Sequence, residues 1–150
     1  MGIISSASGN SCWNGLEYYK RNKVKNLNKI NDCEYLAVVE GTSSYNVHLD
    51  IEHPRRSTCN CPFADGRRVI CKHIVATYFE AVPGSAEDFE EEQERLEMEY
   101  EEARDRQYEN AIKYINKMSK KDLCEEFISV LNYAPLWVYE DFIRNHNIDD

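Results

Sequence analysis

The sequence predicts an α+β fold in which a small antiparallel sheet and one short helix are followed by a set of longer helices. Apolar and polar residues alternate in the segments before residue 52, which is the pattern of strands with one solvated face. Apolar residues recur at helical spacing after residue 72 and again after residue 87. At 150 residues with 42% hydrophobic content, the chain can bury one ordinary core and carry an appendage.

The first third of the chain predicts a β-meander. Residues 1–11 are rich in Ser, Gly and Asn, so we expect them to be disordered or only loosely docked. Three runs of strand character follow, at residues 24–30, 34–40 and 45–51. Turn-forming residues separate these runs, and they predict antiparallel strands that lead directly into the segment beginning at Cys59.

Residues 59–73 contain three thiols and one imidazole in the spacing C-x-C-x9-C-x-H, formed by Cys59, Cys61, Cys71 and His73. Such a set holds structural Zn²⁺ tetrahedrally, and four protein ligands leave no position for water or substrate. Residues two positions apart on an extended chain face the same side, so Cys59 and Cys61 can reach one ion. Inside an α-helix, residues two positions apart lie roughly 200° apart around the helix axis, so Cys71 and His73 cannot both bind the ion from a helix interior. Cys71 should therefore precede a helix that begins near His73. The pattern predicts one structural zinc ion. Unrelated buried thiols or a disulfide set are the alternative.

This motif resembles the SWIM zinc finger. The likeness includes Pro62-Phe63 after the second Cys and the closing segment Cys71-Lys72-His73-Ile74-Val75-Ala76. It implies a ββα unit that holds one Zn²⁺ through the four residues named above. Upstream, residues 15–19, Val24 and residues 45–47 resemble the strands that precede the finger in bacterial SWIM proteins. We therefore expect residues 12–82 to form the β-meander and the finger.

Pro83-Gly84 ends the finger helix, and residues 85–150 predict an acidic helix followed by C-terminal helices. The acidic helix should run from Glu87 to about Met118, with a solvated first half and a packed second half. Its sparse apolar seam leaves open a coiled-coil strip and hence a homodimer. Ser119 and Pro135 are start signals for two further helices, which we expect to form a helical hairpin. We expect the aromatic residues of this hairpin, Trp137 among them, to lie in its core.

No run approaches the roughly 18 apolar residues of a membrane helix, and the N-terminus does not resemble a signal peptide. We therefore expect a cytoplasmic protein with no membrane contact. A reducing compartment would also keep the metal-binding thiols reduced. Cys12, Cys33 and Cys124 have no metal-like spacing, so we interpret them as free buried thiols of undetermined role.

Charge divides the chain into two parts. Residues 1–80 contain ten Lys or Arg and eight Asp or Glu, a net charge of +2, whereas the remainder contains eight and nineteen, a net charge of −11, which together give −9. The acidic part can serve solubility, repel nucleic acid, or mimic it toward a basic partner. Nine basic residues in the first part could neutralise phosphates if they converge on one surface: Lys20, Arg21, Lys23, Lys25, Arg55, Arg56, Arg67, Arg68 and Lys72.

Two functions remain open from the sequence. One is nucleic-acid binding, to DNA rather than RNA, by the finger region; SWIM fingers occur in recombination-associated, transposase-related and helicase-associated proteins, which implies DNA or protein binding for the family. The other is a protein-interaction adaptor that uses the zinc unit as a scaffold and the acidic helical half as a docking surface. We do not expect an enzyme, because the sequence has no Gly-rich phosphate loop and no Ser/His/Asp grouping, and its exposed acidic run has no apolar pocket to shift a pKa.

Overall fold

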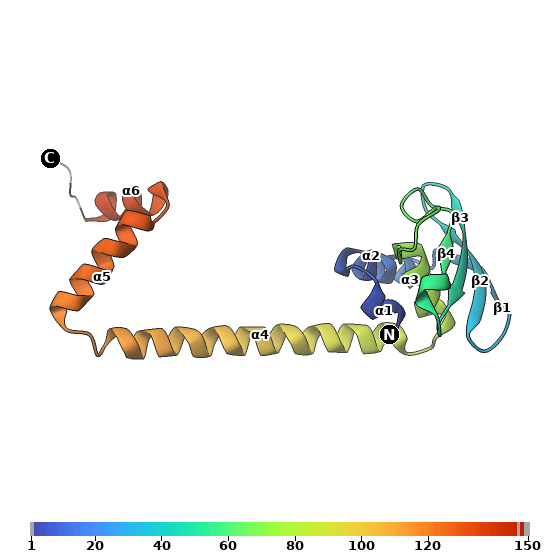
Figure 1. The fold of residues 1–150 in the computed structure, drawn as a ribbon, viewed down its shortest axis with the longest axis horizontal. Coiled ribbons are helices and arrows are strands. Elements are labelled where there is room, and N and C mark those ends of the chain that lie inside the picture. Colours follow the sequence, from blue (N-terminus) through green and yellow to red (C-terminus); the bar gives the residue numbers. More distant parts are fainter. Residues whose placement is uncertain (1, 147, 149–150) are drawn as a thin grey trace. The chain divides into compact units, whose positions relative to one another are not determined.

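The structure is a computed structural model that describes residues 2–146 and residue 148. It shows an α+β fold in which a four-stranded antiparallel sheet precedes a long helix and further helices (Figure 1). In chain order the elements are α1 (Ile3–Ser6), α2 (Gly9–Lys20), β1 (Val24–Lys29), β2 (Glu34–Glu40), β3 (Ser44–Asp50), the 3₁₀-helix η1 (Pro54–Arg56), β4 (Thr58–Cys59), α3 (Lys72–Ala81), α4 (Ser85–Ile115), α5 (Lys120–Tyr133) and α6 (Leu136–Asn145). Two compact units divide the chain between Glu94 and Arg95, inside α4.

The sheet has the strand order β1-β2-β3-β4 with every neighbouring pair antiparallel, which confirms the predicted meander. In β3 the side chains of Val47 and Leu49 are fully buried, whereas Asn46 between Tyr45 and Val47 is exposed. The period-two pattern therefore indicated the core face correctly at Val47 and Leu49, but it was wrong for Asp50, which it placed on the solvated face and which is 2% exposed. β3, β4 and α3 give the ββα order that the resemblance implied.

The core of the first unit lies between the sheet and α3, with α2 packed against α3 (Figure 1). Ile74, Val75 and Phe79 of α3 are all at most 1% exposed. The two helices approach closely at Gly15, where an added Cβ would lie 2.5 Å from Cγ1 of Val75. Glycine at position 15 therefore sets the distance between α2 and α3.

The prediction that residues 1–11 are disordered or loosely docked is wrong for the described residues 2–11. Ile3 is 1% exposed and belongs to the core, and Ser8 caps α2 by accepting a hydrogen bond from the Ser11 N–H group. Ala7 forms a parallel bridge with Ile70, which ties this segment to the loop before α3. The high content of small polar residues here reflects helix capping and close packing instead of loose structure.

The strand-like resemblance of residues 15–19 is also corrected, because these residues belong to helix α2. Cys12, Gly15 and Leu16 are the buried positions of the helix together with Ser11, and their spacing of three to four residues is helical. The sequence signal for this helix was the capping serine at position 8.

The first turns of α4 belong to the first unit. Ala86 is 2% exposed and Phe89 is 8% exposed, and the Phe89 ring lies 5.2 Å from the ring of Trp13 and 5.8 Å from that of Phe79. Lys20 forms an ion pair with Glu90. The core that α3 and the sheet build therefore continues beyond the turn at Pro83-Gly84.

The second unit contains the predicted helices but not the predicted packing. No described residue from 95 onward is buried, and both Tyr108 and Trp137 are 69% exposed. We expected the second half of the acidic helix to pack and Trp137 to lie in a core, and both expectations are wrong. Phe127 and Phe142 form an edge-on ring contact between α5 and α6 at 5.3 Å. An amphipathic pattern specifies a helix with an apolar face, but it does not specify that the same chain covers that face.

Among the described residues, no helix combines the length and apolar character needed to cross a membrane.

Candidate metal centre

Cys59 and Cys61 come from the end of β4 and the turn that follows it. β4 pairs with β3, where Cys59 lies opposite Val47. Asn60 faces away from the two thiols, since its side-chain oxygen accepts a hydrogen bond of 2.8 Å from the Asn46 N–H group. The hydrogen bonds of Asn60 to β3 thus hold its side chain on the side opposite the two thiols, as predicted for the C-x-C pair.

Cys71 and His73 lie at the start of α3. Cys71 is the N-cap residue with extended backbone angles, and His73 lies in the first turn of the helix. This is the arrangement that the helical geometry required of a C-x-H pair. The intervening segment folds back as a turn, in which the Ala64 and Asp65 N–H groups donate to the Cys61 carbonyl.

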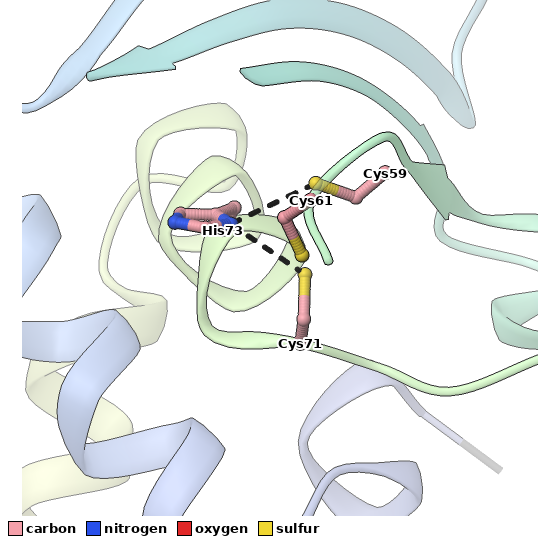
Figure 2. Close-up of side chains that lie close together, drawn as sticks. All are labelled: Cys59, Cys61, Cys71 and His73. Atoms are coloured by element: carbon pink, nitrogen blue, oxygen red, sulfur yellow. Dashed lines mark hydrogen bonds between the residues drawn. The ribbon is translucent and has the colours of Figure 1, made fainter. Parts of the chain in front are cut away.

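The four side chains converge on one point (Figure 2). Their ligand atoms all lie within 4.8 Å of one another, and all four residues are buried. Nδ1 of His73 lies 3.7 Å from Sγ of Cys59 and 3.9 Å from Sγ of Cys71. A tetrahedral zinc ion with Zn–S of about 2.3 Å and Zn–N of about 2.0 Å requires S···N separations of about 3.5 Å. The donor set and its spacing therefore fit one structural zinc ion.

The protein lowers the pKa of one of the thiols. A hydrogen bond from the Cys59 thiol is the largest cause that lowers the pKa of Cys71 to about 4; the His73 side chain and the N–H groups of Ile74 and His73 add to it, while burial opposes it. The same bond, together with burial, raises the pKa of Cys59, which acts as the donor. Zinc binds cysteine as the thiolate, so metal binding would release protons from the cluster.

Two tyrosines fix the orientation of the His73 ring. Tyr45 stacks on it with ring centres 4.6 Å apart and an interplanar angle of 26°, and Tyr18 meets it edge-on at 5.3 Å. The turn between β2 and β3 closes over the ring, because a Cβ on Gly41 would lie 3.0 Å from the Tyr45 ring and 3.4 Å from Nε2 of His73. The sequence reading did not assign Tyr18, Gly41 or Tyr45 to the site. Tyr45 could have been found, since it alternates inward with Val47.

Residues 45–81 match the family model of the SWIM zinc finger. The chain contains a SWIM zinc finger. The matched segment begins in β3, ends with α3 and includes all four metal ligands. No curated protein and no solved structure matches the chain. The SWIM finger and its Cys₃His set therefore identify a zinc-binding module, of a kind that generally serves interactions with nucleic acid or protein.

The nine basic residues proposed from the sequence do not form one surface. Arg55 and Arg56 of η1 and Arg67 and Arg68 of the SWIM loop line the same groove, which has a volume of about 680 Å³ and is bounded by β3 and β4. We call this the arginine groove. Lys72 lines two other hollows, which are described below. The remaining four residues lie on α2 and near β1: Lys20, Arg21, Lys23 and Lys25.

Those four are poorly placed to extend the groove. Lys20 is paired with Glu90, and Arg21 is paired with Glu17. Lys25 is on β1, at the sheet edge opposite β4. The structure therefore separates the predicted basic set into an arginine group beside the zinc loop and a lysine-rich group away from it.

The three cysteines outside the metal set differ from one another. Cys12 is buried, and burial raises the pKa of its thiol. Cys33 is half-buried and Cys124 is exposed. The expectation of buried thiols is therefore correct for Cys12 and wrong for Cys124, because the C-terminal helices have no core in which to bury it.

Proposed function

We propose that this protein is a non-catalytic zinc-binding module that binds nucleic acid, DNA rather than RNA, through the arginine groove. The observation that carries the proposal is the convergence of Arg55, Arg56, Arg67 and Arg68 on one groove, although two separate chain segments supply them. Arginine binds phosphate oxygens through two parallel N–H groups, and a groove lined by one sign of charge concentrates the field.

The charges in the groove are available to a ligand. All four arginines are exposed, and none takes part in an ion pair within the described part of the chain. Asp65 is the one acidic residue among those that line it. The four positive charges therefore exceed the negative charge locally, although the whole chain has a net charge of −9.

Zinc has a structural role in this proposal. Four protein ligands complete a tetrahedral coordination sphere, so the ion holds the SWIM loop instead of activating water. Ala64, Arg67 and Arg68 lie on that loop between the second and third ligands. The metal thereby connects the two loop arginines to β4 and α3, and it sets their distance from the arginines of η1.

The test is a titration of zinc-loaded full-length protein with a labelled DNA duplex at increasing salt concentration. If four phosphates are contacted, the logarithm of the association constant should fall with a slope of about −3.6 against the logarithm of salt concentration. Arg67→Ala combined with Arg68→Ala should weaken binding and reduce the steepness of that slope by about 2. Arg104→Ala combined with Arg106→Ala removes the same charge from α4 and serves as the matched control. Absence of duplex binding even at low salt would refute the proposal.

The second candidate is a protein-interaction adaptor, and the exposed apolar residues of the C-terminal helices favour it. Helices of 14 and 10 residues are marginal in water without tertiary packing, yet neither α5 nor α6 has a buried residue. Leu123, Phe127 and Ile128 of α5 are 42–58% exposed, and Leu136 and Trp137 of α6 about 70%. A partner with an apolar face and basic flanks would cover these side chains and complement the acidic α4. Under this reading the SWIM finger is a scaffold.

A further inference from the structure

The SWIM loop has a second concave surface on the side of Phe63 and Lys72. These two residues lie between two hollows and line both of them. One hollow, of about 220 Å³, is aromatic and includes Tyr18, Thr42, Tyr45 and His73. The other, of about 300 Å³, includes Ser8, Asn10, Ser11 and Asn14. We call Phe63, Lys72 and the two hollows the Phe63 ledge.

Phe63 is the exposed aromatic group of this surface. It is 55% exposed, whereas the two cysteines that flank the ledge, Cys61 and Cys71, are at most 2% exposed. It takes part in none of the ring contacts found among residues 2–146. Tyr18 and Tyr45 already hold the His73 ring, so Phe63 is the exposed ring of the ledge that makes no ring contact.

The ledge also carries unsatisfied polar groups. Lys72 places its Nζ 4.4 Å from the centre of the Tyr18 ring, and no carboxylate in the described ranges lies within ion-pair distance of it. His73 is 4% exposed, and its Nε2 atom is buried without a hydrogen-bond partner. Because Nδ1 faces the sulfurs, Nε2 carries the proton when zinc is bound, and it points away from them (Figure 2). Gly41 and the Tyr18 hydroxyl lie on this side of the ring, where the aromatic hollow is also found.

These groups fit a flat ring that has hydrogen-bonding edges and a neighbouring negative charge. A phosphate alone would use Lys72 but not Phe63, and an apolar side chain would use Phe63 but not the charge of Lys72. A base inside a duplex cannot reach a single exposed phenylalanine, because both of its faces are already stacked. An unpaired nucleobase offers a free face to Phe63, edge atoms to Asn10 and Asn14, and its phosphate to Lys72.

We propose that the Phe63 ledge binds an unpaired nucleobase and its adjoining phosphate, so that the chain prefers nucleic acid with single-stranded segments. This inference rests on the proposed function, because it extends the same ligand from the arginine groove. Residues 61–63 line the ledge and residues 64–68 line the groove, so consecutive parts of one loop form the two surfaces. A strand that crosses the loop can place phosphates on the arginines and one base on Phe63.

The test compares a short oligothymidylate with a duplex of equal length, both binding to zinc-loaded full-length protein. Phe63→Leu keeps an apolar side chain but removes the stacking ring, and Phe63→Trp restores a ring. Phe63→Leu should weaken oligothymidylate binding by about 5- to 150-fold, since stacking on one aromatic side chain contributes about 1–3 kcal/mol. The same change should leave duplex affinity within about twofold, and Phe63→Trp should recover the single-strand affinity. Equal zinc content of the variants confirms that the loop is intact.

The outcomes separate the two proposals. If Phe63→Leu leaves the oligothymidylate affinity unchanged, or lowers the affinity for both ligands equally, the proposal that the ledge binds a base is refuted. The proposal that the arginine groove binds phosphates would still stand. Arg67→Ala with Arg68→Ala should weaken the binding of both ligands, because the groove binds phosphates whether or not the bases are paired. If neither ligand binds even at low salt, the proposed function fails and the ledge fails with it.

Discussion

Replacing a single zinc ligand, Cys71→Ser, tests the metal centre most directly. Cys71 is 1% exposed, occupies the N-cap position of α3 and is the thiol whose pKa is lowered. A serine hydroxyl at this position is a poor ligand for zinc, because it does not ionise near neutral pH. The change therefore leaves three ligands and a buried hydroxyl in a site built for four.

The expected loss is large relative to the stability of a domain. Zinc binding in finger peptides contributes about 10–16 kcal/mol at neutral pH, and a natural domain has a net stability of about 5–15 kcal/mol. The site lies inside the core of the first unit, where three of its ligands belong to the same buried cluster as Phe79 and Leu49. Loss of even half of the free energy of zinc binding would unfold the finger and expose that cluster.

The assay is a thermal melt of the full chain, monitored by near-ultraviolet circular dichroism and accompanied by a zinc measurement. Wild-type protein should hold one zinc per chain and show a cooperative transition that is lost after chelation. Cys71→Ser should hold less zinc and melt without that transition. Cys124→Ser makes the same chemical change on exposed α5 and should behave as wild type. A Cys71→Ser protein that melts like wild type would show that the cluster is not what holds this unit together.

Three further outcomes follow from other parts of the structure. Gly15→Ala should destabilise the first unit by about 1–3 kcal/mol in denaturant unfolding, because its Cβ would lie 2.5 Å from Val75, whereas Gly9→Ala meets nothing within 4 Å and should be tolerated. A maleimide should label Cys124 rapidly in the native protein and spare Cys12. A chelator should make the three metal-binding thiols reactive as well, and mass spectrometry would count the labelled thiols. Neutralising four acidic residues that share one face of α4 should raise DNA affinity more at low salt than at 0.15 M salt, because salt screens the repulsion between these charges and the phosphates; they are Glu94, Glu97, Glu101 and Asp105.

The sequence predicted best the features that depend on neighbours in the chain. The period-two pattern of β3 and the C-x-C and C-x-H spacings are local, so they identified the buried face, the four ligands and the start of α3. Strand pairing then followed from short turns between consecutive strands. These features needed no knowledge of long-range packing.

Long-range packing accounts for the errors. Residues 1–11 look unstructured by composition, but Ile3 fits a space between elements that follow much later in the chain. The apolar faces of α5 and α6 predicted a core, and the chain does not supply one in its described residues. The arginine groove likewise depends on how η1 and the SWIM loop meet beside β3, and the spacing between Arg56 and Arg67 does not reveal it.

The position of the metal explains how one ion would control both proposed binding surfaces without contacting the bound nucleic acid. Residues 59–73 form a loop that zinc holds at both ends, through Cys59 and Cys61 at one end and Cys71 and His73 at the other. Within that loop Phe63 forms part of the Phe63 ledge, and Arg67 and Arg68 line the arginine groove. Without the ion the two ends lose the coordinate bonds that join them, and the distance between the Phe63 ring and the arginines is no longer fixed. Chelation should therefore abolish the preference for unpaired bases together with the affinity for phosphates, and zinc should restore both in parallel.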